Sequence, residues 1–355
     1  MKNQLFSIVL FTALTSCSFA QIGGNSTFRF LDLTQSARQA ALGGNTVSIR
    51  DNDLNTAINN PALLNPEMDR QITFNYNPYF AGIKHGYVAY AKTFDKLGTF
   101  AAGMQFVGYG SFDRTDEAAN DLGTFSAGDY ALNISYVRPV GLDSVLFVGA
   151  TIKGIYSHLD SYSAFGLAAD IGLNYQSKNR RTSAALVVRN AGTQLKSYTS
   201  GNKEPLPVEI EAGITQRLAK APFRFTLTLR HLEKMDMTYT DPAAANETDP
   251  LTGEPKEPEK ISVGNKILRH IIISNEILLS KNFHLRMAYN FQRRNELKVE
   301  SRTALVGISF GLGIRVSKFH LSYGRSIYHL AGGTNSLAIS TYLGDFKKRR
   351  VKTAE

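Results

Sequence analysis

Apolar and polar residues alternate along most of the chain, from about residue 72 to residue 346. In the stretch 165–176, apolar side chains occupy nearly every second position, and glycine, alanine, aspartate or asparagine stands between them. The stretches 130–136, 223–230 and 283–292 repeat the pattern. Successive side chains of a strand point to opposite faces, so each stretch has one apolar face and one polar or small face. This pattern is typical of transmembrane β-barrels.

The alternation predicts an all-β fold, a 14-stranded antiparallel transmembrane β-barrel that spans residues 71–346. The predicted strands cover 72–79, 84–94, 98–109, 127–138, 143–157, 162–177, 181–190, 206–218, 223–232, 265–280, 282–293, 300–313, 315–327 and 335–346. A soluble β-sandwich is the alternative. Its strands are usually shorter, and a polar lumen accounts better for Arg224, Arg230 and Arg286, which lie on the polar face.

The connections between predicted strands support the even count. Those after even-numbered strands are short, whereas those after odd-numbered strands include the long segments 110–126 and 233–264. Outer-membrane barrels have short periplasmic turns and longer external loops. We therefore expect both barrel termini in the periplasm and the acidic, proline-rich segment 233–264 outside the cell. The segment 347–355, with Lys347–Arg350, is then a basic periplasmic tail at the membrane edge.

The first twenty residues have the pattern of a secretory signal peptide. Lys2 precedes the apolar stretch Leu5–Leu14, and Ser18 and Ala20 supply the small residues of a cleavage site before Gln21. Alternatively, Cys17 lies in a lipoprotein-like context and would be acylated. No later stretch has the eighteen or so apolar residues of a transmembrane helix, so a membrane-spanning chain must cross as a closed barrel. These features predict the outer membrane as the location.

Residues 21–70 precede the barrel and do not alternate. A helix is predicted at 34–41, capped by Thr34 or Ser36 and ended by glycines, and a second at 53–58. A fourteen-stranded barrel encloses a lumen that must hold water or a plug. We therefore expect this segment to fold inside the barrel as a helical hatch.

Three short motifs of this segment resemble the FadL-like superfamily of fourteen-stranded barrels. The motif residues are Ser36, Ala37, Arg38, Leu42, Gly43 and Gly44, then Asp51 and Asp53, then Asn60, Pro61 and Ala62. Within that superfamily the chain looks most like the PorV/PorQ proteins of the type IX secretion system of Bacteroidota. Arg189–Gly192, Leu206–Pro207 and Gly213 add to this resemblance, and Phe28–Leu31 with Ala41–Gly44 is nearer to the PorQ pattern.

The resemblance implies a non-enzymatic secretion component of the outer membrane. Such a barrel would anchor a PorZ-like surface protein of the attachment complex that also contains PorU and PorV, next to outer-membrane lipid and lipopolysaccharide. The candidate partner-binding residues lie in the external loop: Asp236, Tyr239, Asp241, Glu247, Asp249 and Glu254. The alternative is a FadL-like transporter of small hydrophobic molecules. An open porin fits less well, because the pre-barrel segment would block it.

The chain offers little recognisable chemistry. Its seven histidines form no H-E-x-x-H motif, its one cysteine lies in the signal segment, and no P-loop occurs. We therefore expect no catalytic residue, no cofactor and no metal, and an exported chain gives no reason to expect a nucleic-acid partner. Asp51 and Asp53 are open to two interpretations: they bind a cation, or they satisfy the hatch backbone and lumenal arginines.

Overall fold

The structure is a computed structural model that describes residues 26–141, 145–199, 201, 203–238, 261–297, 305–329 and 332–346. The predicted signal peptide, the basic tail and most of the 233–264 loop lie outside these residues. No helix within the described ranges is long and apolar enough to cross a membrane.

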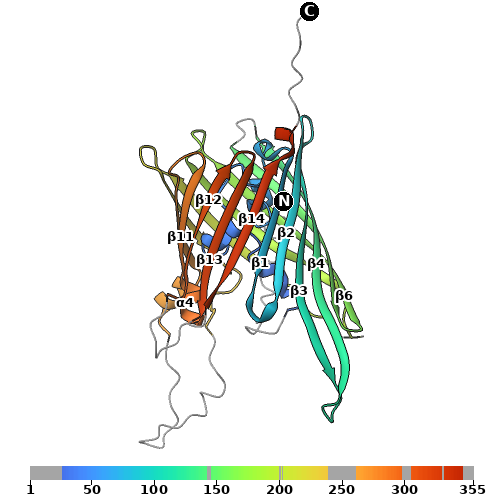
Figure 1. The fold of residues 1–355 in the computed structure, drawn as a ribbon. Helices are drawn as coiled ribbons and strands as arrows, with labels where there is room; N and C mark the ends of the chain where they lie inside the picture. The colour runs from blue at the N-terminus through green and yellow to red at the C-terminus, as the bar shows by residue number, and fades with distance from the viewer. Residues whose placement is uncertain are drawn as a thin grey trace, which may run out of the picture.

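The described residues form a closed barrel of fourteen antiparallel strands, each paired with its neighbours in the chain, and β1 pairs with β14 to close it (Figure 1). The strands are β1 (Gln71–Pro78), β2 (Lys84–Phe94), β3 (Gly98–Thr115), β4 (Asp121–Val140), β5 (Leu146–Leu159), β6 (Tyr162–Gln176), β7 (Thr182–Lys196), β8 (Glu209–Arg217), β9 (Phe223–Leu229), β10 (Ile271–Ile277), β11 (Phe283–Asn290), β12 (Ile308–Val316), β13 (Phe319–His329) and β14 (Gly332–Tyr342). The predicted fold class is confirmed.

The alternation along each strand separates an apolar outer face from a polar or small inner face. On β6, Leu167 and Ile171 are exposed on the outside, whereas Asp170 and Asn174 are buried toward the lumen. On β1, the inner residues are Gln71, Thr73, Asn75 and Asn77. An apolar outer surface on a closed barrel is the arrangement that lipid requires, since each strand of a closed barrel pairs with a neighbour on both sides.

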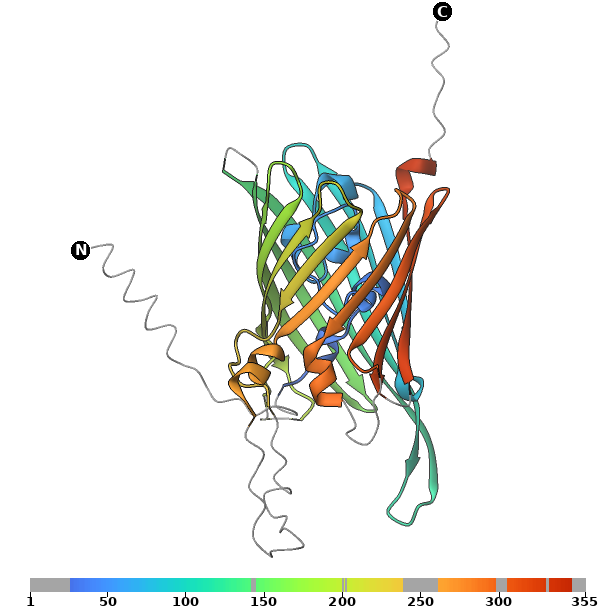
Figure 2. The same cartoon turned by 90° about the vertical axis from the view of Figure 1, so that its left-hand side faces the viewer.

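The connections also follow the predicted parity. The short turns after even-numbered strands lie at one end of the barrel, together with the start of β1 and the end of β14 (Figure 2). We call this the short-turn end. The opposite, long-loop end carries the β3–β4 hairpin and the helices α3 (Val263–Leu268) and α4 (Phe291–Leu297).

Several predicted boundaries are wrong. The predicted loop 110–126 is mostly strand, because β3 and β4 continue to pair as far as Thr115 and Asp121. Beyond the membrane a hairpin needs no apolar outer face, so the alternation no longer marks it. Likewise β7 continues to Lys196, through a register shift opposite β6, where a loop was predicted.

Two predicted strands include helices. The segment predicted as strand 265–280 begins with α3, in which Ser262 Oγ accepts the Asn265 N–H. The segment predicted as strand 282–293 ends at Asn290, whose side chain accepts the Arg293 N–H at 2.9 Å and so caps α4. In addition, β12 ends at Val316 instead of 313, and β14 ends at Tyr342, where a 3-10 turn, η7 (Leu343–Phe346), follows.

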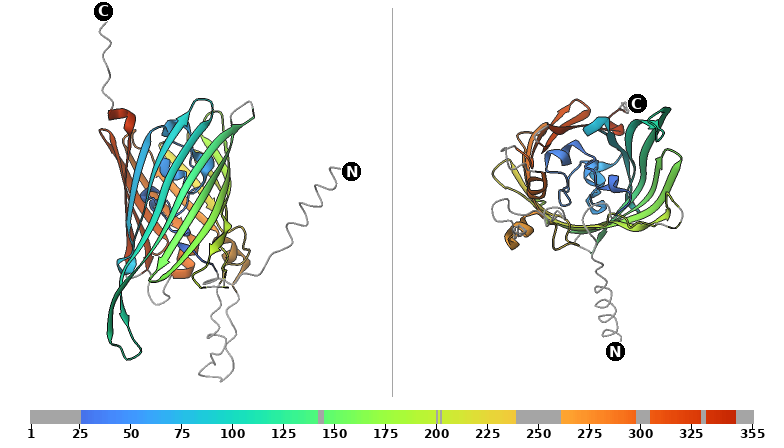
Figure 3. Two further views of the ribbon diagram at one scale, coloured as in Figure 1. Left: turned by 90° about the vertical axis from the view of Figure 1, so that its right-hand side faces the viewer. Right: turned by 90° about the horizontal axis from the view of Figure 1, so that it is seen from below.

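The segment before the barrel lies inside the lumen (Figure 3). We call residues 26–70 the lumenal segment. It contains η1 (Arg29–Asp32), α2 (Ala37–Ala41), η2 (Leu54–Thr56), η3 (Pro61–Leu63) and η4 (Pro66–Met68). Only one of the two predicted helices is an α-helix, and it is shorter than predicted. Ser36 takes its N-cap position without a side-chain cap hydrogen bond. The second is the 3-10 turn η2.

Two apolar clusters hold the lumenal segment to the wall. In one, Leu54, Leu64 and Met68 pack on small or aromatic inner residues of β2, β3 and β4. In the other, Phe28, Phe30 and Leu31 pack on inner residues of β3 to β6. Burial of apolar side chains stabilises such contacts, so the segment is a packed part of the fold.

Candidate functional site

Two facing pairs of glycines let the lumenal segment approach the wall closely. Gly311 of β12 pairs with Gly324 of β13, and α2 lies against them. A Cβ at Gly311 would lie 2.6 Å from the Cβ of Ala41, and one at Gly324 would meet the carbonyl of Ala37. Ser326 Oγ also donates to the Ala40 carbonyl at 2.9 Å. The helix of the first motif, Ser36–Gly44, therefore packs directly on the backbone of two wall glycines.

The N-P-A motif is seated in the same way on another part of the wall. Gly149 of β5 pairs with Gly172 of β6, and a Cβ at either position would overlap the turn Asn60–Ala62. The turn is fixed internally, because Asn60 accepts the Ala62 N–H at 2.9 Å and donates to the Val47 carbonyl at 2.8 Å.

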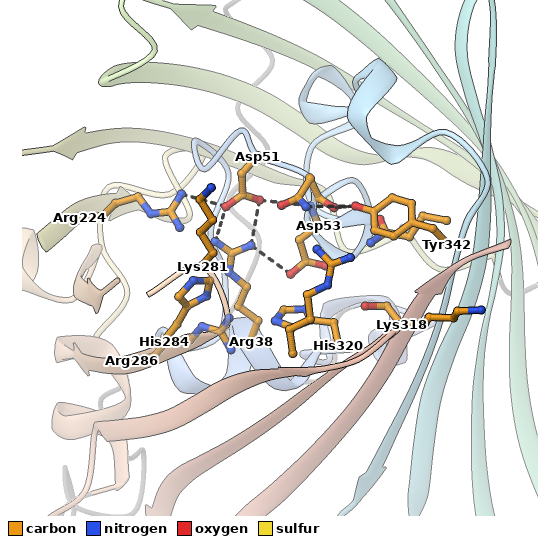
Figure 4. A pocket seen from close by; sticks show the side chains of 14 residues that line it. Arg38, Asp51, Asp53, Arg224, Lys281, His284, Arg286, Lys318, His320 and Tyr342 are labelled. Atoms are coloured by element: carbon orange, nitrogen blue, oxygen red, sulfur yellow. Dashed lines mark hydrogen bonds and ion pairs between the residues drawn. The ribbon is translucent and has the colours of Figure 1, made fainter. Parts of the chain in front are cut away.

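Arg38 is the centre of a buried charge network (Figure 4). Its guanidinium donates to Asp51 at 2.7 and 3.0 Å and to Asp53 at 3.0 Å. It also donates to both oxygens of Glu276, each at 3.1 Å. Asp51 and Asp53 therefore both form ion pairs with Arg38, which belongs to the same lumenal segment. Of the two interpretations of the D-x-D pattern, the geometry matches the one in which both aspartates satisfy arginines.

Two wall arginines complete the network. Arg224 of β9 lies 2.9 Å from Asp51 and 2.8 Å from Glu276, and Arg286 of β11 lies 3.1 Å from Glu276. Three guanidinium groups therefore face three carboxylates. Buried charges are tolerated when they are paired and hydrogen-bonded in this way, so the network ties the lumenal segment to β9, β10 and β11.

The charge of Asp51 is stabilised by this arrangement. Burial by itself raises the pKa of the Asp51 carboxyl, but the guanidinium groups of Arg38 and Arg224 oppose burial and hold that pKa well below its usual range. Asp51 therefore carries its charge at any pH at which the protein is expected to work.

A cavity of the short-turn end opens beside this network (Figure 4). The lumenal segment contributes Asp51 and Asp53 to the lining of this cavity. The turns and strand ends of the wall contribute the cations Lys281, Arg315 and Lys318. His284 and His320 line the same cavity with their rings 6.3 Å apart. Tyr342 donates to the Asn52 carbonyl at 3.0 Å. The lining is charged and polar.

A second network lies farther along the lumen. Arg189 is 2.8 Å from Glu211, Arg230 is 2.8 Å from Glu209, and Asn45 of the lumenal segment donates to Glu211 at 2.7 Å. Lys153 is 2.7 Å from Asp170, and both are almost fully buried. Ser48 and Thr215 are hydrogen-bonded at 2.8 Å.

The predicted motif residues are thus distributed over several contacts. Arg38, Asp51 and Asp53 meet in one network, whereas Asn60–Ala62 lies on a different part of the wall. Gly43 and Gly44 end α2 with positive φ values of 92° and 121°, and Asn290 and Arg293 both donate to the Gly43 carbonyl. Leu42 is buried beside them.

Sequence reasoning missed the carboxylates of the wall, Glu276, Glu209 and Glu211. Each occupies an inward position of its strand, and an acidic residue at such a position is a usable signal. Of the candidate loop residues, Asp236 lies 2.6 Å from Lys266 of α3. Tyr239, Asp241, Glu247, Asp249 and Glu254 lie outside the described residues. Within the described ranges, no group of three or more metal-ligating side chains is present.

The sequence matches no protein-family model and no curated protein. Solved structures do match. The toluene transporter TbuX of Ralstonia pickettii has 11% identity, a coverage of 88% of this chain and 99% of its own, and a TM-score of 0.51. A deltaS2 mutant of the monoaromatic hydrocarbon channel TodX of Pseudomonas putida has 13% identity, coverages of 87% and 97%, and a TM-score of 0.52. A Pseudomonas aeruginosa FadL homologue has 11% identity, coverages of 87% and 98%, and a TM-score of 0.47.

At sequence identities this low, the similarity between this chain and the solved structures is a similarity of fold alone. The wall and the lumenal segment define a closed β-barrel of fourteen strands with an apolar outer face, and its fold is similar to the folds of TbuX and TodX. Its interior is occupied by its own N-terminal segment.

Proposed function

We propose that this barrel is a PorQ-like, non-enzymatic component of a type IX secretion system in the outer membrane of a member of the Bacteroidota. Its task is to hold a PorZ-like surface protein of the cargo attachment complex, alongside PorU and PorV. The observation that carries the proposal is the occupied lumen: charge networks and glycine contacts fix the lumenal segment to several parts of the wall. The motifs of that segment resemble those of PorQ proteins, and this resemblance is the reason for proposing that family.

The occupied lumen favours a role for the outer face over passage of a solute. An apolar molecule that crossed beside α2 would have to separate Arg38 from Glu276, or displace Arg224 and Arg286 from the same carboxylate. Leaving a buried charge without its partner is strongly unfavourable. A barrel that serves as an anchor needs no such opening.

The long-loop end is the side proposed to bind the partner. It carries the β3–β4 hairpin, α3, α4 and Asp236. In the sequence, further acidic residues such as Glu254 follow Asp236 before α3 begins. Outer-membrane lipid and lipopolysaccharide would surround the wall at that end. Acidic and polar side chains on an external loop are suited to electrostatic recognition of a protein partner.

The test is copurification from the native cell in mild detergent, with partners identified by mass spectrometry. Replacing residues 239–260 by a short neutral linker should abolish capture of a PorZ-like protein. As the control, the same treatment of the hairpin tip 116–120, at the same end of the barrel, should leave capture intact. A deletion strain should leave cargo unattached or unprocessed. Normal cargo attachment in that strain would refute the proposal.

A second candidate is a FadL-like transporter of small hydrophobic molecules. The fold comparisons support this candidate better than they support a secretion role, because the matched structures are described as a toluene transporter and a monoaromatic hydrocarbon channel. It predicts that the purified barrel speeds entry of a monoaromatic hydrocarbon into liposomes. Protein-free liposomes and liposomes with a barrel whose lumenal segment is cross-linked to the wall are the controls.

A further inference from the structure

Three arginines lie side by side across neighbouring strands at the short-turn end. The Arg217 N–H donates to the Arg181 carbonyl at 2.8 Å, which places the end of β8 beside the start of β7, and Arg217 is the cross-strand partner of Arg224 on β9. We call these residues the arginine row. Arg217 and Arg224 take inward positions of their strands, in step with Thr215 and Thr226, and Arg181 precedes β7, two residues before the inward Ser183. Arg181 and Arg217 are exposed at the barrel end, and Arg224 is half-buried. Like charges that face each other across strands are destabilising.

The arginine row lines a cavity, and two more arginines line the same cavity. Arg180 belongs to the β6–β7 turn, and Arg50 belongs to the lumenal segment. The cavity encloses about 310 Å³. Since a water molecule occupies roughly 30 Å³ in the liquid, the cavity has room for a hydrated small anion.

The carboxylates of the cavity do not balance its five guanidinium groups. Asp51 pairs with Arg224 at 2.9 Å, and Glu67 pairs with Arg180 at 2.7 Å. Within the part of the chain that the structure describes, Arg50, Arg181 and Arg217 have no ion pair. Among the described residues, three of the five guanidinium groups of the cavity therefore have no carboxylate partner.

Arg50 is held in position for a ligand. Its guanidinium lies 3.6 Å from the centre of the Phe147 ring and donates to Gln176 at 3.1 Å and to the Leu64 carbonyl at 3.1 Å. Its Nε–H is buried and has no hydrogen-bond partner. A buried donor left unpaired is costly, and an anion in the cavity would reduce that cost by compensating the charge of the group.

We propose that this arginine cavity binds a phosphate group. Guanidinium groups present planar pairs of N–H donors that match the oxygens of phosphate, and an excess of three cations suits a multiply charged oxyanion. The phosphate comes either from a small soluble compound or from a phospholipid headgroup at the membrane edge. The binding is independent of whether the barrel anchors a partner or transports a solute.

Equilibrium dialysis of the full folded barrel in neutral detergent with radiolabelled pyrophosphate tests the proposal. We expect saturable binding by the unmodified chain and about tenfold or greater weakening in the Arg181→Gln/Arg217→Gln variant. The matched control is Lys96→Gln/Lys220→Gln, which removes the same charge from turns of the same end and should bind like the unmodified chain. Circular dichroism and thermal unfolding establish that each variant is folded.

Sedimentation with vesicles of zwitterionic lipid, with or without phosphatidylglycerol, supplies the second arm. Pyrophosphate binding that depends on Arg181 and Arg217 supports a soluble ligand. Binding to acidic vesicles alone, with the same dependence, supports the same cavity with a lipid headgroup as the ligand. Equal weakening in both double variants would show general charge attraction and overturn the proposal. An absence of binding in both arms would also overturn it.

Discussion

Arg38 of α2 and Glu276 of β10 form a bidentate ion pair, with both hydrogen bonds at 3.1 Å, although the residues are 238 positions apart in the chain. Arg38 brings Asp51 and Asp53 of its own segment to the pair, and Glu276 brings Arg224 and Arg286 of the wall. The pair therefore joins the lumenal segment to the barrel.

Glu276→Gln should destabilise the folded barrel. The substitution removes the one carboxylate that is shared by Arg38, Arg224 and Arg286, and breaking a buried charge pair costs about 3–5 kcal/mol. Thermal unfolding of the detergent-solubilised protein and protease access to residues 26–70 measure the effect. Glu296→Gln on the exposed face of α4 is the matched control and should change stability by less than about 0.5 kcal/mol. Equal stability of the two variants would contradict the assigned role of the network.

Gly149→Val should weaken the seat of the N-P-A turn. A side chain at this position of β5 would meet the backbone of Pro61 and Ala62, and such overpacking costs about 1–3 kcal/mol. The control lies on the same strand: Gly154 has open space around it, so Gly154→Val should leave the lumenal segment in place. Cross-linking mass spectrometry between the segment and β5 distinguishes the variants. A similar loss of cross-links in both would show that the glycine contact is not specific.

The fourteen strands could be predicted because lipid on one side and a polar lumen on the other impose a strict alternation. The alternation fails where one of those conditions ends. The β3–β4 hairpin extends past the apolar band, and only its pairing marks it as strand. At Asn290 a side-chain cap starts α4, although the preceding residues alternate. Short apolar patterns of helices and strands overlap too closely for the sequence to separate α3 from β10.

The site was predicted in part. The motifs around Arg38, Asp51 and Asn60 identified the segment that occupies the lumen, but not its partners. In the sequence, Asn275 and Glu276 are visible only as an interruption of an apolar stretch. The ion pairs of Glu276 are formed with arginines of other elements, which its sequence neighbourhood does not identify. The same holds for the arginine row: Arg181, Arg217 and Arg224 become neighbours only through strand register.

The lumenal network should persist in mild acid. Burial raises the pKa of Asp51, but Arg38 and Arg224 outweigh burial and lower it. A depressed carboxyl pKa contributes stability that is fully present above the unfolded value of about 4 and is lost as the pH falls through the folded value. Protease access to residues 26–70 should therefore stay constant from pH 8 to 5 and rise only in stronger acid. For Asp51→Asn, the part of that rise caused by Asp51 should disappear. An opening between pH 7 and 5 would contradict this assignment.

A disulfide between Ser48→Cys and Thr215→Cys should distinguish a fixed lumenal segment from a moving one. The two hydroxyl oxygens are 2.8 Å apart across the contact between the segment and β8, so the substituted sulfurs are close enough to bond after small adjustments. Cys17→Ser removes the only native thiol, and the two single-cysteine variants are the controls.

If the barrel is an anchor, the oxidised double variant should capture its surface partner as well as the unmodified chain does. If it is a transporter whose lumenal segment must move, oxidation should abolish hydrocarbon entry into liposomes, and reduction should restore it. Unchanged entry in the oxidised state would exclude a route that requires movement of Ser48 away from Thr215.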